Sequence, residues 1–357
     1  MAHDDVLVTL SVVYAPASGE DPTKGIRSSG DKTDMHRRSL IAASLAAPSL
    51  PSLAWAQGEW RPNRPINIII PFAAGSGTDA VARLLGQMLS AELGGVSITI
   101  DNRAGANGTI AAGAAMRAAP DGHTLFVTTN TTHGANTWLL KRIDYDPIAD
   151  FTPISRLGQY IFWLTVGAEV PARNFQEFIA LARARPGQIS YASGNGTGIV
   201  AGATIARLAG VEMIHVPYRS TPPALTDVIA GRVSAIVVDL TPSLGHVREG
   251  RLRALGTTNA RRSVLVPETP TLAEQGLTGF DLQSFAALFG PKNLPPEVTA
   301  TLAAAMQRIG ARPEYRARLA DLGFDGFVST PQELQRFVIE QIAAWGEMIR
   351  GAGIEPE

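Results

Sequence analysis

The chain is organised around the stretch Ile66-Asn67-Ile68-Ile69-Ile70-Pro71-Phe72-Ala73-Ala74-Gly75-Ser76-Gly77-Thr78. Its almost continuous apolar start is typical of a strand covered on both faces. The glycine-containing part turns the chain, and Ser76 or Thr78 can cap a following helix that has Asp79 in its first turn. Apolar residues then recur at helical spacing until Gly94-Gly95. A strand, loop and helix in this order direct backbone N–H groups and the positive end of a helix dipole at one spot, which suits an anion.

Composition limits the possible classes of protein. A chain of 357 residues with 45% apolar and 18% charged residues is typical of a globular protein, and its length favours two lobes. The net charge of −1 gives no basic field, so we expect no nucleic-acid partner. The chain contains no cysteine, which excludes disulfides, thiolate metal sites and a cysteine nucleophile.

The first 56 residues carry a targeting pattern. Residues 1–34 are polar and lack helical periodicity, so we interpret them as an extension that does not belong to the native protein. A basic start at 35–38, an apolar run at 40–47 and the small-x-small signal Ala54-Trp55-Ala56 then follow in the order of a secretory signal peptide. We therefore expect Met35 to be the true start, removal of residues 35–56 near Ala56, and export to the periplasm. The sequence does not distinguish Sec export from twin-arginine export. The apolar run at 40–47 is too short to anchor the protein in a membrane.

Alternating strand and helix patterns predict parallel sheets with crossover helices. In the first half, strands are expected at 66–70, 96–100 and 125–129, with a helix at 109–118. The loops after these strands, including the one that holds Asn130, fall at the carboxyl ends of parallel strands, where ligands collect. Further strands are expected at 162–166, 189–192, 212–216, 235–238, 252–258 and within 279–289, and helices at 175–183, 201–208, 224–229 and in the tail.

A second strand, polar loop and helix repeat the logic of the first. The predicted strand at 189–192 opens into Ser193-Gly194-Asn195-Gly196-Thr197-Gly198, and a helix of small residues follows at 201–208. Two such units suggest two lobes that each present a helix N-terminus to a shared cleft. Residues 145–153 are expected to form a connection between elements, and Asp239 ends a buried strand and leads into a turn at Pro242. The tail helices are expected to pack on the first lobe.

Several motifs in consistent order resemble those of a known family. The sequence is similar to the substrate-binding receptors of tripartite tricarboxylate transporters, which form the Bug-type family. The motifs that carry this resemblance are Pro71-Phe72-Ala73-Ala74-Gly75 with Asp79, Asp101-Asn102-Arg103-Ala104-Gly105-Ala106, Pro120-Asp121-Gly122-His123-Thr124-Leu125, Tyr145-Asp146-Pro147, Tyr191-Ala192-Ser193, His215-Val216-Pro217-Tyr218, Leu252-Arg253-Ala254-Leu255 and Pro270-Thr271-Leu272-Ala273-Glu274.

The resemblance implies an α/β, type II-like periplasmic binding protein with two lobes. Each lobe is expected to be a mostly parallel sheet flanked by helices, with two crossover strands as the hinge. Residues 57–157 and 281–357 would form lobe 1, and residues 158–280 would form lobe 2. The resemblance further implies a monomer without cofactor or bound metal that passes a small carboxylate to the membrane components of a transporter.

The expected site comprises residues from both lobes. In the resembling family, two facing loops hold one ligand carboxylate through backbone N–H groups, hydroxyls and water. We therefore expect ligand contacts from Phe72, Ala73, Ala74, Gly75, Ser76, Thr78, Asn130, Ser193, Asn195, Gly196, Thr197, Gly198, Tyr218, Arg219 and Asp239. The chain departs from the family pattern at Val200, where histidine is frequent, and at Arg219-Ser220, where Lys-Gly is usual.

Ligand identity and some residue roles stay open at the sequence level. A dicarboxylate, a tricarboxylate and an aromatic acid all fit the expected carboxylate site. Arg219 could pair with a second carboxylate, and Asp239 could accept a ligand hydroxyl or amine or only anchor the following turn. The competing function is an exported hydrolase that acts on a small carboxylic ester or amide. A Gly-x-Ser-x-Gly motif is absent and the histidines are scattered, so the sequence favours a binding protein over an enzyme.

Overall fold

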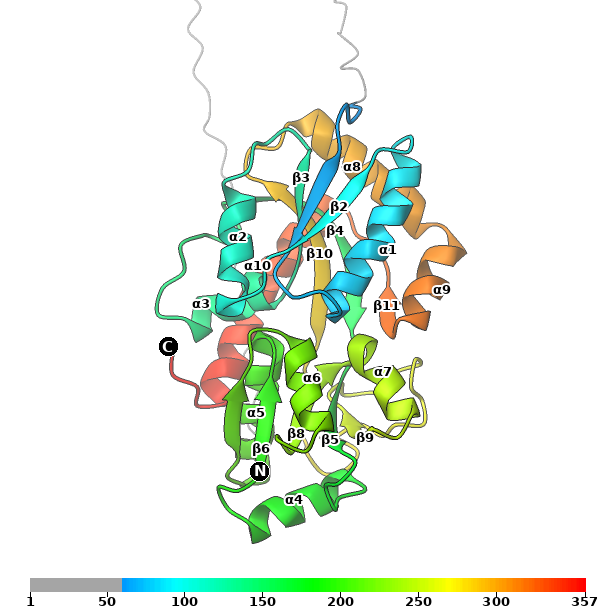
Figure 1. The fold of residues 1–357 in the computed structure, drawn as a ribbon. Helices are drawn as coiled ribbons and strands as arrows, with labels where there is room; N and C mark the ends of the chain where they lie inside the picture. Colours follow the sequence, from blue (N-terminus) through cyan, green and yellow to red (C-terminus); the bar gives the residue numbers. More distant parts are fainter. Residues whose placement is uncertain (1–59) are drawn as a thin grey trace, which may run out of the picture. The chain divides into compact units, whose positions relative to one another are not determined.

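The computed structural model describes residues 60–357 (Figure 1). The extension predicted at 1–34, the predicted start at Met35 and the signal peptide predicted at 35–56 lie outside the described residues. Within residues 60–357, no helix combines the length and apolar character needed to cross a membrane.

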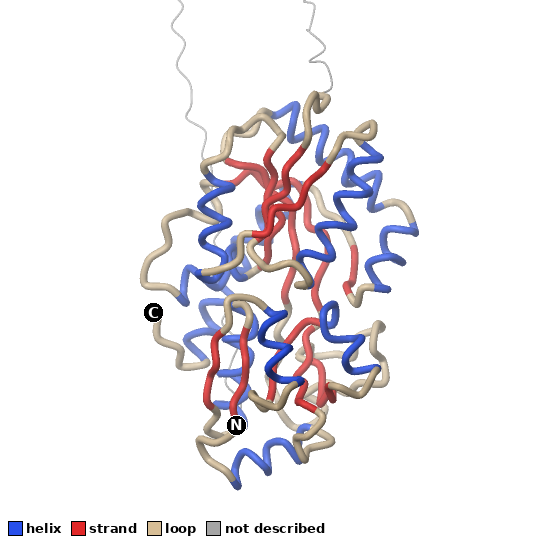
Figure 2. The backbone as a smooth tube through the Cα atoms, viewed as in Figure 1, coloured by secondary structure: helices blue, strands red, loops and turns tan. Residues whose placement is uncertain are grey.

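Two β-sheets organise the described residues (Figure 2). We call the part built on the six-stranded sheet lobe 1 and the part built on the five-stranded sheet lobe 2. The first sheet has the order β11-β4-β10-β3-β1-β2, with β1 at Ile66–Ile70, β2 at Ile98–Asn102, β3 at Thr124–Thr129, β4 at Phe151–Tyr160, β10 at Ser284–Pro291 and β11 at Phe324–Gly326. The second has the order β7-β6-β8-β5-β9, with β5 at Phe162–Gly167, β6 at Ser190–Ser193, β7 at Ile214–Pro217, β8 at Ala235–Asp239 and β9 at Leu252–Thr257.

Helices cover both faces of each sheet (Figure 1). Lobe 1 carries α1 (Gly77–Glu92), η1 (Ala106–Gly108), α2 (Thr109–Met116), η2 (Thr131–Ala135), α3 (Asn136–Leu139), α8 (Pro296–Gly310), α9 (Pro313–Asp321) and α10 (Pro331–Gly351). Lobe 2 carries α4 (Phe175–Ala184), α5 (Gly196–Ala209), α6 (Thr221–Ile229) and α7 (Leu240–Arg248). The tail helices pack on lobe 1 as expected: α8 contacts α1 and β4, α9 contacts β11, and α10 packs on η2 and β4.

The first strand is buried on both faces, as the sequence predicts. Ile66, Ile68 and Ile70 are fully buried in the cluster that also holds the apolar face of α1. Ile69 points to the opposite face and packs in a cluster with residues of α2 and α10. Full burial of an isoleucine side chain contributes about 1.5–3 kcal/mol, so β1 anchors both layers of helices to the sheet.

The α/β class with two sheets is confirmed, but the expectation of mostly parallel sheets is wrong. β1 pairs in parallel with β2 and β3, whereas β10 lies antiparallel between β3 and β4, and β11 is antiparallel to β4. In the second sheet, β6 is parallel to β7 and β8, and β5 is antiparallel to β8 and β9. β5 and β10 each enter their lobe from the other one. Each of these two strands therefore runs in the direction opposite to its neighbours in the sheet, so both sheets are mixed.

Two further expectations are corrected. Part of the connection expected at 145–153 is the start of β4, whose Pro153 pairs with Phe289 at an irregularity in the ladder. Proline is tolerated at such positions because a ladder hydrogen bond is already missing there. The turn expected at Pro242 is the first turn of α7, with Asp239 as its N-cap residue. Proline fits the first turn of a helix, where its missing N–H has no intrahelical partner.

The two connections between the lobes lie side by side. β4 passes into β5 through the single residue Ile161, and the second connection runs from β9 to β10. The Thr258 N–H donates to the Phe162 carbonyl at 3.0 Å, and the Leu282 N–H donates to the Thr258 carbonyl at 3.0 Å. The hydrogen bonds tie the crossing strands into one narrow ribbon, which leaves the sheet edges on either side of it facing each other.

Candidate ligand-binding site

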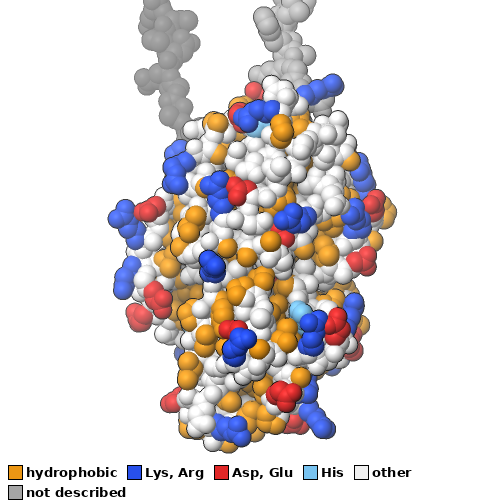
Figure 3. Space-filling model, viewed as in Figure 1, with side chains coloured by type: hydrophobic (Ala, Val, Ile, Leu, Met, Phe, Trp, Pro, Cys, Tyr) orange, Lys and Arg blue, Asp and Glu red, His pale blue; other side chains and the backbone are white. Residues whose placement is uncertain are grey.

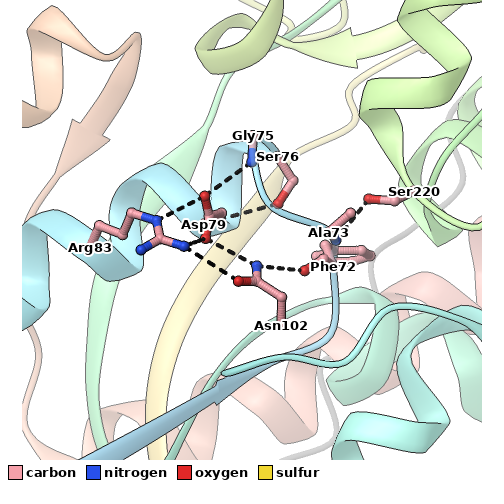
Figure 4. Close-up of polar contacts among 8 residues, drawn as sticks. All are labelled: Phe72, Ala73, Gly75, Ser76, Asp79, Arg83, Asn102 and Ser220. Atoms are coloured by element: carbon pink, nitrogen blue, oxygen red, sulfur yellow. Dashed lines mark hydrogen bonds and ion pairs between the residues drawn. The ribbon is translucent and has the colours of Figure 1, made fainter. Parts of the chain in front are cut away.

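The loop between β1 and α1 is held in shape by Asp79 (Figure 4). The Asp79 N–H donates to Ser76 Oγ at 3.2 Å, which confirms Ser76 as the cap of α1. The Asp79 carboxylate in turn accepts the Gly75 N–H at 3.0 Å. Gly75 has a φ of +82°, a conformation that glycine adopts without strain. Hydrogen bonds within the protein therefore hold this turn against the first turn of α1 without help from a ligand.

Two further side chains, Asn102 and Arg83, orient this carboxylate. Asn102, at the end of β2, donates to Asp79 Oδ1 at 3.0 Å and to the Phe72 carbonyl at 2.9 Å. Arg83 Nε donates to Asp79 Oδ2 at 3.1 Å, and the two side chains form an ion pair one helical turn apart. Burial alone would raise the pKa of Asp79, but the hydrogen bonds from Arg83, Gly75 and Asn102 outweigh it and lower the pKa. Asp79 is therefore an ionised anchor of the loop within lobe 1.

The corresponding loop of lobe 2 is the first turn of α5. The sequence predicts a helix only from Ala201, but α5 begins at Gly196. Asn195 caps it, because its Oδ1 accepts the Gly198 N–H at 2.8 Å. Gly196 is closely packed, since a Cβ there would lie 3.3 Å from Thr131 Cγ2 of lobe 1. The small residues that look like a loop in the sequence thus form a helix end pressed against the other lobe.

Ser193, at the end of β6, pairs with a histidine that the sequence analysis does not assign to the site. Its Oγ lies 2.7 Å from His215 Nε2, and the imidazole stacks on Tyr191 at 4.9 Å. Burial lowers the pKa of His215, which leaves a neutral ring beside the hydroxyl, although Glu357 acts in the opposite direction. Parallel pairing of β6 with β7 sets Tyr191 opposite His215 and so brings this histidine beside the end of β6.

The first turn of α5 meets the loop after β3 of lobe 1 through buried polar groups. Asn130 Nδ2 of lobe 1 donates to Thr197 Oγ1 of lobe 2 at 2.9 Å. The Gly196 N–H, at the start of α5, donates to Thr131 Oγ1 at 3.2 Å. Ser284, at the start of β10, hydrogen bonds to Asn130 Oδ1. Thr131 and Ser284 are not among the site residues predicted from the sequence. Ser284 comes beside the loop after β3 only through the antiparallel pairing of β10 with β3.

A second contact joins the loop before α1 to the loop before α6 (Figure 4). The Ala73 N–H of lobe 1 donates to Ser220 Oγ of lobe 2 at 3.1 Å. Ser220 is fully buried. The residue noted as a departure from the family pattern thus supplies a hydroxyl that crosses between the lobes.

A third contact brings Asp239 against the start of α1. Asp239 is only 5% exposed, and a Cβ built on Gly77 would lie 2.1 Å from its Oδ1. Burial raises the pKa of Asp239 to about 7, partly offset by polar groups at the start of its own helix, Thr241 among them. Nearby, the Tyr160 hydroxyl donates to Thr78 Oγ1 at 3.2 Å.

The other predicted site residues lie at the margin of this junction. Ala74 and Arg219 are exposed, and the Tyr218 hydroxyl donates to Asp227 within lobe 2 at 2.5 Å. A hollow of about 450 Å³ opens where Gly75 meets α6 and α7, and its lining includes Pro222, Leu225, Ile229, Pro242, His246 and Arg251. Figure 3 shows apolar side chains gathered over α6, with charged side chains on either side of them. Among residues 60–357, no three His, Asp or Glu side chains lie close enough together to hold a metal ion.

Two α/β lobes joined by a narrow ribbon, with the N-terminal ends of α1 and α5 turned toward their junction, define a two-lobed solute-binding protein. The sequence profile of the tripartite tricarboxylate transporter family receptor, TctC, matches residues 81–354. The chain belongs to this family, whose members are periplasmic solute-binding proteins. The resemblance seen in the sequence motifs is therefore confirmed.

Similar proteins support the same assignment. The chain is 32% identical over 322 residues to the UPF0065 protein in the tcbD-tcbE intergenic region of Pseudomonas sp. (strain P51), which covers 89% of this chain and 95% of that protein. The structure of R. palustris Rpa4515 with adipate matches with a TM-score of 0.80 and 31% identity over 83% of this chain and 99% of that one. MatC (Rpa3494) from Rhodopseudomonas palustris with bound malate matches with a TM-score of 0.75 and 33% identity, over 81% and 99% of the two chains.

Proposed function

We propose that this protein captures a small carboxylate between its lobes and delivers it to the membrane components of a tripartite tricarboxylate transporter. The observation that carries the proposal is that the N-terminus of α5 in lobe 2 meets the loop after β3 of lobe 1, while the N-terminus of α1 in lobe 1 lies against Asp239 of lobe 2. Asn130 and Thr131 of lobe 1 hydrogen bond to Thr197 and Gly196 at the start of α5. Such ends favour negative charge through their N–H groups and dipoles. The solved relatives described with adipate and with malate bind ligands of this chemical class.

We assign the ligand contacts to the residues of the two loops. Residues 72–78 would supply backbone N–H groups and hydroxyls from lobe 1, and Ser193 with residues 195–198 would supply them from lobe 2. Each hydrogen bond to a charged group contributes about 1.5–3 kcal/mol, so three or four together reach the roughly 8 kcal/mol of a micromolar complex before ordering costs are subtracted. Asn130 and Asp239 would complete the site, whereas Tyr218 and Arg219 would act only at its margin.

We further propose a hinge motion between residues 57–157 with 281–357 and residues 158–280. In the structure, polar groups of the two lobes contact one another directly, as between Ala73 and Ser220. These contacts represent a closed arrangement. A ligand that bridges both lobes binds this arrangement better than an open one, so ligand binding and closure stabilise each other.

The experiment that tests the function is a thermal-shift screen of the purified protein with succinate, adipate, citrate, terephthalate and nicotinate. A ligand at 100 times its dissociation constant adds about 2.7 kcal/mol of stability, which raises Tm by several degrees. Non-acidic analogues such as the matching diamides are the control. A rise with an acid but not with its diamide supports carboxylate capture, whereas no rise with any acid contradicts it.

An exported hydrolase is the alternative, and the Ser193–His215 contact of 2.7 Å is the observation that would favour it. The Ser193 side chain is only 1% exposed, and no Asp or Glu among the described residues hydrogen bonds to His215, so the pair lacks the third group of a catalytic triad. A binding role fits this burial better, and the protein would have no catalytic function. Turnover of p-nitrophenyl acetate that is lost in Ser193→Ala would instead support the hydrolase.

We propose that the protein acts in the periplasm as a monomer and that residues 35–56 direct its export. Family membership supports a periplasmic location. Release of the mature protein by osmotic shock, with an N-terminus near Gln57, is the expected result. Recovery only with the membrane fraction would contradict this localisation.

A further inference from the structure

The junction between the lobes contains two buried polar atoms that lack a partner. Asp239 Oδ1 and Thr241 Oγ1 make no hydrogen bond of ordinary geometry with any described residue, although Thr241 lies close enough to Asp239 to lower its pKa somewhat. Asp239 is the last residue of β8 and the N-cap residue of α7, and its side chain is 95% buried, since only 5% is exposed. A buried acceptor without a donor costs about 1–3 kcal/mol, and more when it is charged. Such a group calls for an explanation beyond packing.

The unpartnered carboxyl oxygen points across the junction. It lies against Gly77, the first residue of α1, since a Cβ there would come within 2.1 Å of Asp239 Oδ1 and 3.3 Å of Thr241 Cβ. Close to it, the Tyr160 hydroxyl donates to Thr78 Oγ1 at 3.2 Å. The Tyr160 proton is therefore not available to Asp239, and no hydrogen bond joins Thr78 Oγ1 to Asp239 Oδ1 among the described residues.

Asp239 also lies at the edge of the sheet that carries the carboxylate loop of lobe 2. β6 and β8 are parallel neighbours, with Ala192 opposite Ile236. Their carboxyl ends, at Ser193 and Asp239, therefore fall at the same edge of the sheet, facing the start of α1. A ligand bound between the N-termini of α1 and α5, as proposed above, would have Asp239 as an acidic side chain beside it.

The chemistry of the neighbourhood favours a ligand that brings a proton donor. Burial raises the pKa of Asp239 to about 7, so its charge is poorly solvated. A second ligand carboxylate at this position would add like charge to a buried acidic group. A hydroxyl or ammonium group would instead donate the hydrogen bond that Oδ1 lacks.

We infer that Asp239 is a specificity-determining residue that accepts a hydrogen bond from a hydroxyl or ammonium group of the ligand. The site then selects carboxylates substituted with such a group over their unsubstituted counterparts. This inference rests on the proposed function, because it names the class of carboxylate that the same site takes.

The test uses ligand pairs that differ by one donor group. Calorimetry compares succinate with L-malate and with L-aspartate, tricarballylate with citrate, and terephthalate with 2-hydroxyterephthalate, for the wild type, Asp239→Ala and Asp239→Asn. We expect the wild type to bind the substituted member of at least one pair about tenfold or more tightly. Asp239→Ala should abolish this ratio. Asp239→Asn should keep a preference for a hydroxyl, since its amide oxygen still accepts, but lose a preference for an ammonium group.

Thr197→Ala is the matched control, because it should weaken both members of a pair without changing their ratio. Equal affinities within every pair that binds to the wild type would overturn the inference, as would an unchanged ratio in Asp239→Ala. If Asp239→Ala fails to fold, the wild-type ratios and Asp239→Asn decide the question. Binding of acids without any preference would leave the proposed function intact and refute only the role of Asp239. Absence of binding to all these acids would refute both.

Discussion

Asn130 Nδ2 and Thr197 Oγ1 lie 2.9 Å apart, one on each lobe, although 67 positions separate them in the chain. Both side chains are almost completely buried, at 0% and 1% exposure. The hydrogen bond joins the loop after β3 to the first turn of α5. It is therefore a direct contact between the two lobes at the position proposed for the ligand.

We predict that Thr197→Ala weakens binding of the cognate carboxylate by a factor of about ten or more, because it removes a hydroxyl that serves a charged ligand and the lobe contact. Calorimetry with the acid identified by the thermal-shift screen measures the change. Thr197→Ser keeps the hydroxyl and is the control, with an expected affinity close to the wild type. Unchanged affinity in Thr197→Ala would refute the assignment of this hydroxyl to the site.

We predict that Ser220→Ala weakens ligand binding by up to about tenfold, because the Ala73 N–H loses its acceptor in the closed arrangement. The opening rate of the complex, followed by stopped-flow fluorescence, should rise in parallel. Ser234→Ala removes a hydroxyl that hydrogen bonds to Ser190 within lobe 2 and serves as the control. If both variants affect affinity equally, Ser220 has no special role in closure.

We predict that Gly77→Ala hinders closure without unfolding lobe 1. Alanine is favourable in a helix, but its Cβ would collide with Asp239 Oδ1 at 2.1 Å in the closed arrangement. Small-angle scattering should show no ligand-induced compaction, and affinity should fall at least about tenfold. Gly245→Ala in α7 is the control, since nothing lies within 4 Å of a Cβ at that position.

The double variant Gly77→Ala with Asp239→Ala separates this collision from a loss of helix stability. Removing the Asp239 carboxyl leaves space for the new methyl group, so compaction on ligand addition should return. If the double variant stays as extended as Gly77→Ala alone, the collision with Asp239 is not the cause.

We predict that Asp239 makes the stability of the protein fall as pH rises from about 4 to about 7. The pKa of this carboxyl is raised to about 7 in the folded protein, against about 3.9 for an unfolded aspartate, so its favourable contribution is complete below pH 4 and lost through pH 7. Asp239→Asn mimics the protonated form. Its Tm should match the wild type near pH 4 and exceed it by a few degrees at pH 8.

Exposed Asp144, which pairs with Arg142 on the surface, supplies the control for this titration. Asp144→Asn removes the same charge from the surface, so comparison of the two variants isolates the effect of the buried carboxyl. A Tm difference for Asp239→Asn that does not depend on pH would show that the buried carboxyl keeps an ordinary pKa.

The sequence alone determined the class of protein and the first of its two loops. The isoleucine run, the Gly75-Ser76-Gly77 turn and the Asp79 position specify a buried strand and a capped helix through local rules, because burial pattern and capping depend on neighbouring residues. The repeated strand, loop and helix around Ser193 indicated the second lobe for the same reason. The family motifs then added the function class.

Only the tertiary structure decided how these pieces meet. The contacts of Thr131 with Gly196, of Ala73 with Ser220 and of Gly77 with Asp239 join segments distant in the chain, and nothing local in the sequence specifies such pairs. The direction of β5 and β10 likewise depends on where the chain passes between the lobes. Local hydrogen bonding and hydrophobic periodicity fix the elements, whereas the packing of two separate sheets fixes which polar groups are buried face to face.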